Sequence, residues 1–156
     1  MLRMIVASIL IAGVSAGSWA QDITYRQHIR PLWLQKCAAC HGADAPYLGD
    51  FDEAKKKYQA AFKGPRMDTY ADLVFFVGWP DTGAIQRRLD DGKSTGDGKP
   101  GNMHQYLGAT GEERQKNLDL FKEWVGKDAW KLNRWEARGK VPAITKQDVD
   151  KIKVKY

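Results

Sequence analysis

Two cysteines and a histidine stand within five residues of one another, in the run Cys37-Ala38-Ala39-Cys40-His41. Two thiols separated by two residues can form thioether bonds to the two vinyl groups of one porphyrin, and a histidine directly after the second thiol can then ligate the iron. We therefore predict that Cys37 and Cys40 attach one haem c covalently and that His41 is the proximal ligand of its iron.

Other chemistries of two nearby thiols fit this chain less well. A dithiol redox site would be expected within a βαβ pattern, which the residues around the motif do not show. A structural zinc site needs four ligands, and the sequence has no second cysteine pair and no closely spaced histidine pair to complete them. A structural disulfide between Cys37 and Cys40 is the remaining alternative.

The N-terminus predicts export. Arg3 begins a short positive region, Met4 to Val14 form an apolar stretch, and Ser18-Trp19-Ala20 places small residues at a signal-peptidase site. We expect residues 1–20 to be a signal peptide cleaved after Ala20, because the apolar stretch is short for a membrane-spanning anchor. Attachment of c-type haem takes place outside the cytoplasmic membrane, so the expected location is a bacterial periplasm, without stable membrane insertion after cleavage.

The mature chain is expected to be one domain, residues 21–156, with a basic C-terminal extension at 132–156. The formal charge of the whole chain is +6, and residues 133–156 hold seven Lys or Arg against three Asp or Glu. This positive surface is either simply solvated or a docking site for a redox partner with an acidic surface. Export, and the absence of any recognition motif, argue against nucleic-acid binding.

The spacing of apolar residues before the cysteine motif is helical. Ile29, Leu32 and Trp33 share one face of a segment that runs from Tyr25 to His41, and Pro31 is expected in its first regular turn. Such a helix would lead directly into the haem-binding residues. The periodicity of the short apolar stretch from Tyr70 to Val77 fits a strand as well as a helix, and a helix is expected there because its neighbours are helical. An all-α fold is predicted.

Helical signals recur along the rest of the chain. Asp50 is a predicted N-cap for an apolar stripe that ends at Phe62, and Thr110 forms a predicted capping box with Glu113. The further helices are expected at 50–63, 70–77, 80–91 and 110–125, with a glycine-rich loop at 91–102. Apolar residues of the basic extension are expected to pack back onto the domain: Val149, Ile152 and Val154.

Two stretches resemble the class I cytochromes c. Residues 29–32 (Ile-Arg-Pro-Leu) and 37–42 (Cys-Ala-Ala-Cys-His-Gly) are similar to the opening of that family, and residues 111–125 are similar to its closing helix. The resemblance covers most of residues 24–126. It implies a cytochrome c-like fold in which the N- and C-terminal helices cross beside one covalently bound haem.

The crossing helices of that family bring apolar side chains together beside the haem. The resemblance implies that Leu32 and Trp33 meet Phe121 and Val125. Burial in an ordinary core would place these four side chains in the same positions.

The resemblance also points to a sixth iron ligand. Beyond the signal peptide the chain has two methionines, Met67 and Met103, and two histidines besides His41, namely His28 and His104. Class I cytochromes c take a distal methionine from a loop before the last helix, and Met103 stands in that place. His104 is the alternative, since it occupies the position after the methionine where family members often carry proline. A methionine ligand raises the reduction potential relative to bis-histidine ligation.

A carbonyl partner is expected for the second ring nitrogen of His41, because such a hydrogen bond orients a ligating imidazole. Pro46-Tyr47-Leu48 is similar to the Pro-x-Leu segment that supplies this carbonyl in the family. The alternative is that Pro46 is an ordinary turn proline.

Taken together, these residues favour an electron carrier with a six-coordinate haem, His/Met ligation and redox proteins as donor and acceptor, rather than an enzyme. One alternative is a haem enzyme or gas sensor with an open sixth site, in which His104 would act with Arg66 or Arg114. A second alternative is a haem-bearing subunit of a larger oxidoreductase, which the basic extension could serve.

Overall fold

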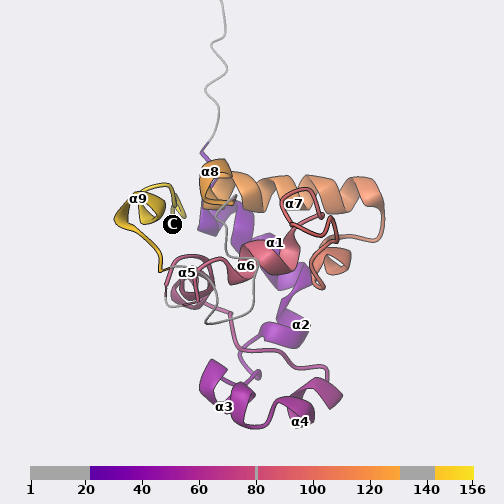
Figure 1. Cartoon of the computed structure of the whole chain (residues 1–156). Coiled ribbons are helices and arrows are strands. Elements are labelled where there is room, and N and C mark those ends of the chain that lie inside the picture. Colours follow the sequence, from indigo (N-terminus) through magenta and orange to yellow (C-terminus); the bar gives the residue numbers. More distant parts are fainter. Residues whose placement is uncertain (1–21, 80, 131–142) are drawn as a thin grey trace, which may run out of the picture.

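The computed structural model describes residues 22–79, 81–130 and 143–156. The predicted signal peptide and residues 131–142 of the basic extension lie outside the described residues. The described part of the chain contains helices and no strand, which confirms the predicted all-α fold (Figure 1). In chain order the helices are η1 (Tyr25–Ile29), α1 (Arg30–Lys36), α2 (Ala38–His41), α3 (Leu48–Glu53), α4 (Lys55–Ala60), α5 (Tyr70–Val77), α6 (Ala84–Leu89), η2 (His104–Leu107), α7 (Gly111–Val125), α8 (Lys127–Trp130) and α9 (Lys146–Val149).

The predicted N-terminal helix is continuous, with a π-helical first part and an α-helical second part. Its first turn, η1, is a π-helix that Thr24 caps, and α1 follows without interruption. Pro31 stands at the start of α1, where its missing N–H has no helical partner to lose. His28 accepts a hydrogen bond from the backbone N–H of Thr24 through Nδ1, at 3.1 Å, so this histidine helps to cap the helix.

Helix α7 lies across η1 and α1, as expected for a terminal pair of helices (Figure 1). The rings of Trp33 and Phe121 meet edge to face, with centroids 6.4 Å apart, which confirms that predicted contact. Thr110 caps α7 as predicted, but the Glu113 carboxylate accepts from the backbone N–H of Ala109 rather than from that of Thr110. Glu113 also pairs with Lys36, and this ion pair joins α7 to the end of α1.

The helix expected at 50–63 is two short helices. The chain bends at Ala54, whose φ of −125° and ψ of 37° are not helical, so α3 ends and α4 begins there. Asp50 lies in the first turn of α3 rather than at its cap. Phe51 is buried, but Phe62 is 82% exposed, so the expected apolar stripe does not persist. The two helices form a small lobe at the end of the molecule opposite α7 (Figure 1).

The two central helices agree with the sequence pattern. A capping box between Thr69 and Asp72 starts α5, which buries Leu73, Phe76 and Val77. The segment expected as helix at 80–91 is helical at its centre, where α6 turns Ile85 and Leu89 into the core.

The end of the basic extension is part of the core structure. Backbone N–H groups of Lys153 and Val154 donate to the last carbonyls of α7, and the N–H of Tyr25 donates to Lys155 O at 2.8 Å. The indole Nε1 of Trp124 also donates to Lys155 O, at 2.9 Å. Ile152 and Val154 pack against the core as predicted, whereas Val149 is 47% exposed. The last residues therefore hold η1 against α7, in addition to any role of their charge.

Candidate haem-binding site

The cysteine motif is a short helical turn at the end of α1. The N–H of Cys37 donates to Trp33 O at 2.8 Å, and the N–H groups of Cys40 and His41 both donate back to Cys37 O. Neither thiol is in a disulfide, so the structure does not support that alternative. Cys40 is exposed, whereas burial raises the pKa of Cys37 to about 12, with a smaller increase from the neighbouring Cys40.

His41 is oriented by a carbonyl of the segment that follows α4. Its Nδ1 lies 2.7 Å from Pro65 O and must donate, because a carbonyl oxygen can only accept. Burial lowers the pKa of the imidazole, which the hydrogen bond to Pro65 partly opposes. A neutral ring that donates from Nδ1 keeps a lone pair on Nε2, and this is the form of histidine that ligates metals.

The expectation that Pro46 supplies this carbonyl is wrong. Pro46 O instead accepts from the backbone N–H of Arg66, at 2.7 Å. Residues 64–67 lie alongside the motif, because Gly64 N–H donates to Cys40 O and Met67 N–H donates to His41 O, both at 2.9 Å. The sequence Pro65-Arg66-Met67 also reads as proline, any residue and an apolar residue, and this signal could have pointed to the correct proline.

Gly64 leaves the space that the His41 ring occupies. A Cβ added to Gly64 would lie 2.1 Å from Cε1 of His41 and 2.7 Å from its Nδ1. Trp33 is also near the imidazole, with ring centroids 6.1 Å apart. The motif histidine is therefore confined by backbone on one side and by a buried indole nearby.

The loop that carries Met103 is bound to the end of α6 through three successive carbonyls. Met103 N–H donates to Arg88 O at 2.9 Å, and Gly101 N–H donates to Asp90 O at 2.9 Å. Between them, Nδ1 of His104 donates to Leu89 O at 3.0 Å. The Met103 side chain is partly buried and packs against the hydrophobic core.

Comparisons with known proteins identify the family of the chain. The model of the PccH cytochrome c family matches residues 24–156 of the chain. The chain belongs to the PccH cytochrome c family. The solved structure of the monohaem cytochrome PccH from Geobacter sulfurreducens is 51% identical, with a TM-score of 0.76, and the match covers 87% of this chain and 100% of that one. None of the curated proteins compared with the chain gave a match.

As a member of the PccH cytochrome c family, the protein is an electron-transfer haem protein with one covalently bound c-type haem and its iron. The residues of the motif fit that group. Two free thiols and a histidine with an available Nε2 stand on one helical turn. Nε1 of Trp33, beside His41, is a buried donor with no hydrogen-bond partner among the described residues, as expected next to a site for a further group.

Two further features of the described residues concern clusters of metal-ligating side chains and helices long enough to cross a membrane. In the described part of the chain, no group of three or more His, Cys, Asp or Glu side chains is arranged to hold a metal ion. Among the same residues, no helix has both the length and the apolar character that a membrane crossing requires.

The structure reveals one buried residue of the methionine loop that sequence reasoning missed. The side chain of Asp90 is fully buried, and Oδ1 accepts from the N–H groups of Gly92 and Ser94, at 2.8 and 3.1 Å. Oδ2 accepts from the indole Nε1 of Trp130, at 2.7 Å. The run Asp90-Asp91-Gly92 is a turn signal in the sequence, but nothing in it identifies the distant tryptophan.

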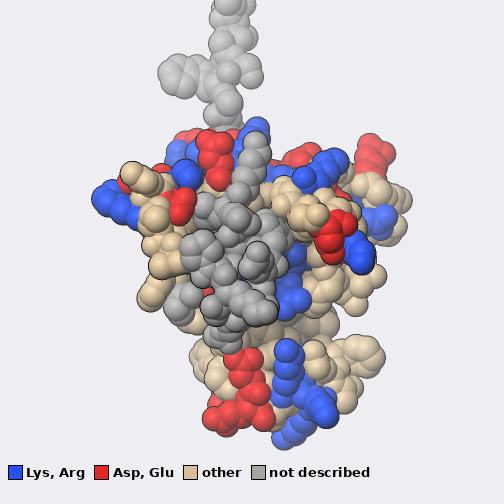
Figure 2. All heavy atoms as spheres, viewed as in Figure 1, with Lys and Arg blue, Asp and Glu red and all other residues tan. Residues whose placement is uncertain are grey.

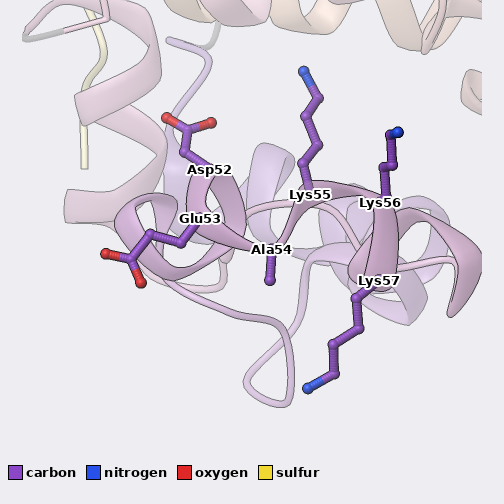
Figure 3. A pocket seen from close by; sticks show the side chains of 6 residues that line it. All are labelled: Asp52, Glu53, Ala54, Lys55, Lys56 and Lys57. Carbon is purple, nitrogen blue, oxygen red and sulfur yellow. The ribbon is translucent and has the colours of Figure 1, made fainter.

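An open hollow on the surface of the cytochrome lies over α3 and α4 (Figure 3). It is lined by residues 52–57, which include three consecutive lysines and two acidic residues. It contains none of the predicted haem ligands, so we do not assign it to the haem.

Proposed function

We propose that this chain is a periplasmic electron carrier whose haem is attached through Cys37 and Cys40 and whose iron is ligated by His41 and Met103. The domain would be residues 21–156, after removal of the signal peptide 1–20. The bound iron would supply the chemistry, which is reversible exchange of one electron. The single observation that carries the proposal is the hydrogen bond from His41 Nδ1 to Pro65 O, because it leaves Nε2 of a motif histidine available as a ligand.

The polypeptide's part in this function is to hold its ligands in place. His41 is oriented by Pro65, and the Met103 loop is bound to α6 through its backbone. Ligands held by hydrogen-bonded backbone have little freedom to rearrange when the charge of the iron changes. Such rigidity favours electron transfer over binding of an external molecule at the metal.

The contacts of the candidate distal groups argue against an enzyme or gas sensor. The Arg66 guanidinium donates from Nε and Nη2 to the two carboxylate oxygens of Asp68, at 2.5 and 3.1 Å, and from Nη1 to the Tyr47 hydroxyl. Arg114 donates to the carbonyls of Gly108 and Ala109, and His104 donates to Leu89 O. Each group proposed for acid–base work at an open site thus already has a structural partner.

The expected partners are redox proteins with acidic docking surfaces. The whole chain carries a formal charge of +6, and complementary charge accelerates encounter between proteins. The basic extension contributes to this charge, although its last residues are also needed to hold the fold together.

Replacing Met103 by alanine is the direct test of the proposed ligation. The wild-type ferric protein should show the weak near-infrared band of sulfur-to-iron ligation, and its ferrous form should not react readily with carbon monoxide. Met103→Ala should lose the band completely and bind carbon monoxide, because the sixth position is then open. The measurement is an optical spectrum in both oxidation states, with and without carbon monoxide.

Met67→Leu is the matched control for this variant. Met67 is 9% exposed and belongs to the core, and leucine preserves most of its volume, so the near-infrared band should persist. A band that survives in Met103→Ala would reject Met103 as the ligand. A wild-type ferrous protein that binds carbon monoxide as fast as the variant would favour the sensor or enzyme instead.

A further inference from the structure

Phe62 has an unusual backbone conformation and an exposed ring. Its φ is +55°, in the left-handed region, and its side chain is 82% exposed. It follows α4 in the hydrogen-bond pattern of a Schellman motif: Phe62 N–H donates to Gln59 O, and Lys63 N–H donates to Tyr58 O. Phe62 occupies the left-handed position of that motif.

This position normally favours glycine, because a Cβ in the left-handed region meets the backbone. A buried ring could offset such strain through packing, but the ring of Phe62 is in solvent. Strained residues of this kind are concentrated at sites that contact other molecules. We therefore expect the exposed ring to contact another molecule.

Phe62 is held close to the haem-attachment motif. The ammonium group of Lys63 donates to Ala39 O at 3.0 Å and pairs with Asp44. Gly64 N–H donates to Cys40 O. The residues directly after Phe62 are thus bound to the turn that carries the exposed Cys40 thiol, where the proposed function places one edge of the porphyrin.

The charge near the ring is positive. Lys55, Lys56 and Lys57 lie on α4 and are exposed. At a helical rise of about 1.5 Å per residue, their Cα atoms lie about 8–11 Å from that of Phe62, which is close to one Debye length at physiological salt. Lys55 and Lys56 extend to one side of the helix and Lys57 to the other (Figure 3).

Acidic and basic side chains are separated on this lobe. Acidic groups gather on one side of it and Lys or Arg groups on the other (Figure 2). Asp52 and Glu53 belong to α3, whereas the three lysines belong to α4, which leads to Phe62. Phe62 therefore follows directly after the helix that carries the basic groups.

We propose that Phe62 and the lysines of α4 form the docking surface for the redox partner, and that this partner is a protein with an acidic rim around an apolar depression. The ring would enter the depression while the lysines pair with the rim. A second copy of this chain is disfavoured as the occupant, because it carries the same lysines and the same positive formal charge. The proposal rests on the proposed electron-carrier function.

Phe62→Gly separates stability from docking. Glycine relieves the left-handed strain, so the melting temperature of the holoprotein should rise by about 2–4 °C. The probe is a gold electrode coated with a mixed monolayer of carboxylate-ended and methyl-ended alkanethiols. On it, the interfacial electron-transfer rate of Phe62→Gly should fall by about fivefold or more, as for loss of a central interface aromatic. On a purely carboxylate monolayer the variant should match the wild type.

Two further variants complete the experiment. Trp79→Ala removes another exposed ring, 71% exposed and two residues beyond α5, and should change neither rate. The triple variant Lys55→Gln, Lys56→Gln and Lys57→Gln should slow transfer by about tenfold on both monolayers at low salt. Its rate should also become much less sensitive to salt, because the screened charges are gone.

The outcomes distinguish this inference from the proposed function. A reversible one-electron wave in the wild type, with unchanged rates for Phe62→Gly on both monolayers, would overturn the docking surface alone. A melting temperature that falls in Phe62→Gly would remove the premise of strain and overturn it as well. A wild type with no reversible wave on either monolayer would instead overturn the electron-carrier function.

Discussion

Gly64→Ala is expected to yield a polypeptide that carries little haem. The added Cβ would lie 2.1 Å from Cε1 of His41, and neither side has room to move. The backbone of residue 64 is bound to Cys40 O, and the ring is bound to Pro65 O. The methyl group must therefore break the hydrogen bond that orients His41 or separate residues 64–67 from the motif.

The expected loss of haem is large because the substitution changes the orientation of His41, the proposed iron ligand. Overpacking costs about 1–3 kcal/mol even where neighbours can shift. Loss of the group that orients a metal-ligating histidine typically weakens the metal site by about 10–100-fold. We expect the haem-to-protein absorbance ratio of purified Gly64→Ala to fall by about tenfold relative to the wild type.

Gly49→Ala is the control for this substitution. No atom lies within 4 Å of a Cβ added to Gly49, which is inside α3, so alanine there should raise helix stability by about 0.5–1 kcal/mol. Pro65→Ala is a second control, since it keeps the carbonyl that His41 uses. Full haem content and an unchanged spectrum in Gly64→Ala would contradict the confined geometry described for His41.

Asp90→Ala is expected to destabilise the protein and release Met103, the proposed distal ligand. Removal of the carboxylate leaves three N–H donors without their partner: those of Gly92, Ser94 and the Trp130 indole. Each unsatisfied buried donor costs about 1–3 kcal/mol, and part of this cost is recovered if water enters. A loss of about 3–5 kcal/mol is expected, which for a domain of this size lowers the melting temperature by on the order of 10 °C.

Asp90→Asn distinguishes the hydrogen bonds to the backbone from the hydrogen bond to the indole of Trp130. The amide oxygen can still accept from the backbone N–H groups, but the amide nitrogen cannot accept from the indole of Trp130. Asp90→Asn should therefore lower the free energy of unfolding by about 1–2 kcal/mol. The double variant with Trp130→Phe should be destabilised by less than the sum of the two single changes, because both remove the same hydrogen bond. The near-infrared sulfur band reports whether the Met103 loop is released.

Asp97→Ala is the matched control within the same loop. The Asp97 carboxylate accepts from Lys99 N–H at 3.0 Å but is exposed, so its removal should change stability by less than about 0.5 kcal/mol. Equal effects of Asp90→Ala and Asp97→Ala would show that burial of Asp90 does not anchor the loop.

Local patterns in the sequence were enough to predict most helices and to propose the attachment motif. Cys37, Cys40 and His41 lie within five residues of one another, so the motif is recognised without knowledge of the rest of the chain. Helix α7 follows from its cap and apolar spacing and α6 from its apolar residues, which are local signals, whereas α5 was expected to be helical because its neighbours are. The Trp33–Phe121 contact was predictable because both residues lie on the apolar faces of helices that the family resemblance pairs.

Only the tertiary structure shows which groups form hydrogen bonds with these residues. Every residue has a carbonyl, so side-chain identity does not reveal that Pro65 rather than Pro46 faces His41. The same holds for the three carbonyls at the end of α6 that bind the Met103 loop, and for the indole of Trp130, which is distant from Asp90 in the sequence. The bend at Ala54 has the same origin, since local helical spacing does not record which half of a segment will find a surface to pack against. Residue types and their spacing are enough to predict local chemistry, whereas the partner of a polar group depends on the path of the whole chain.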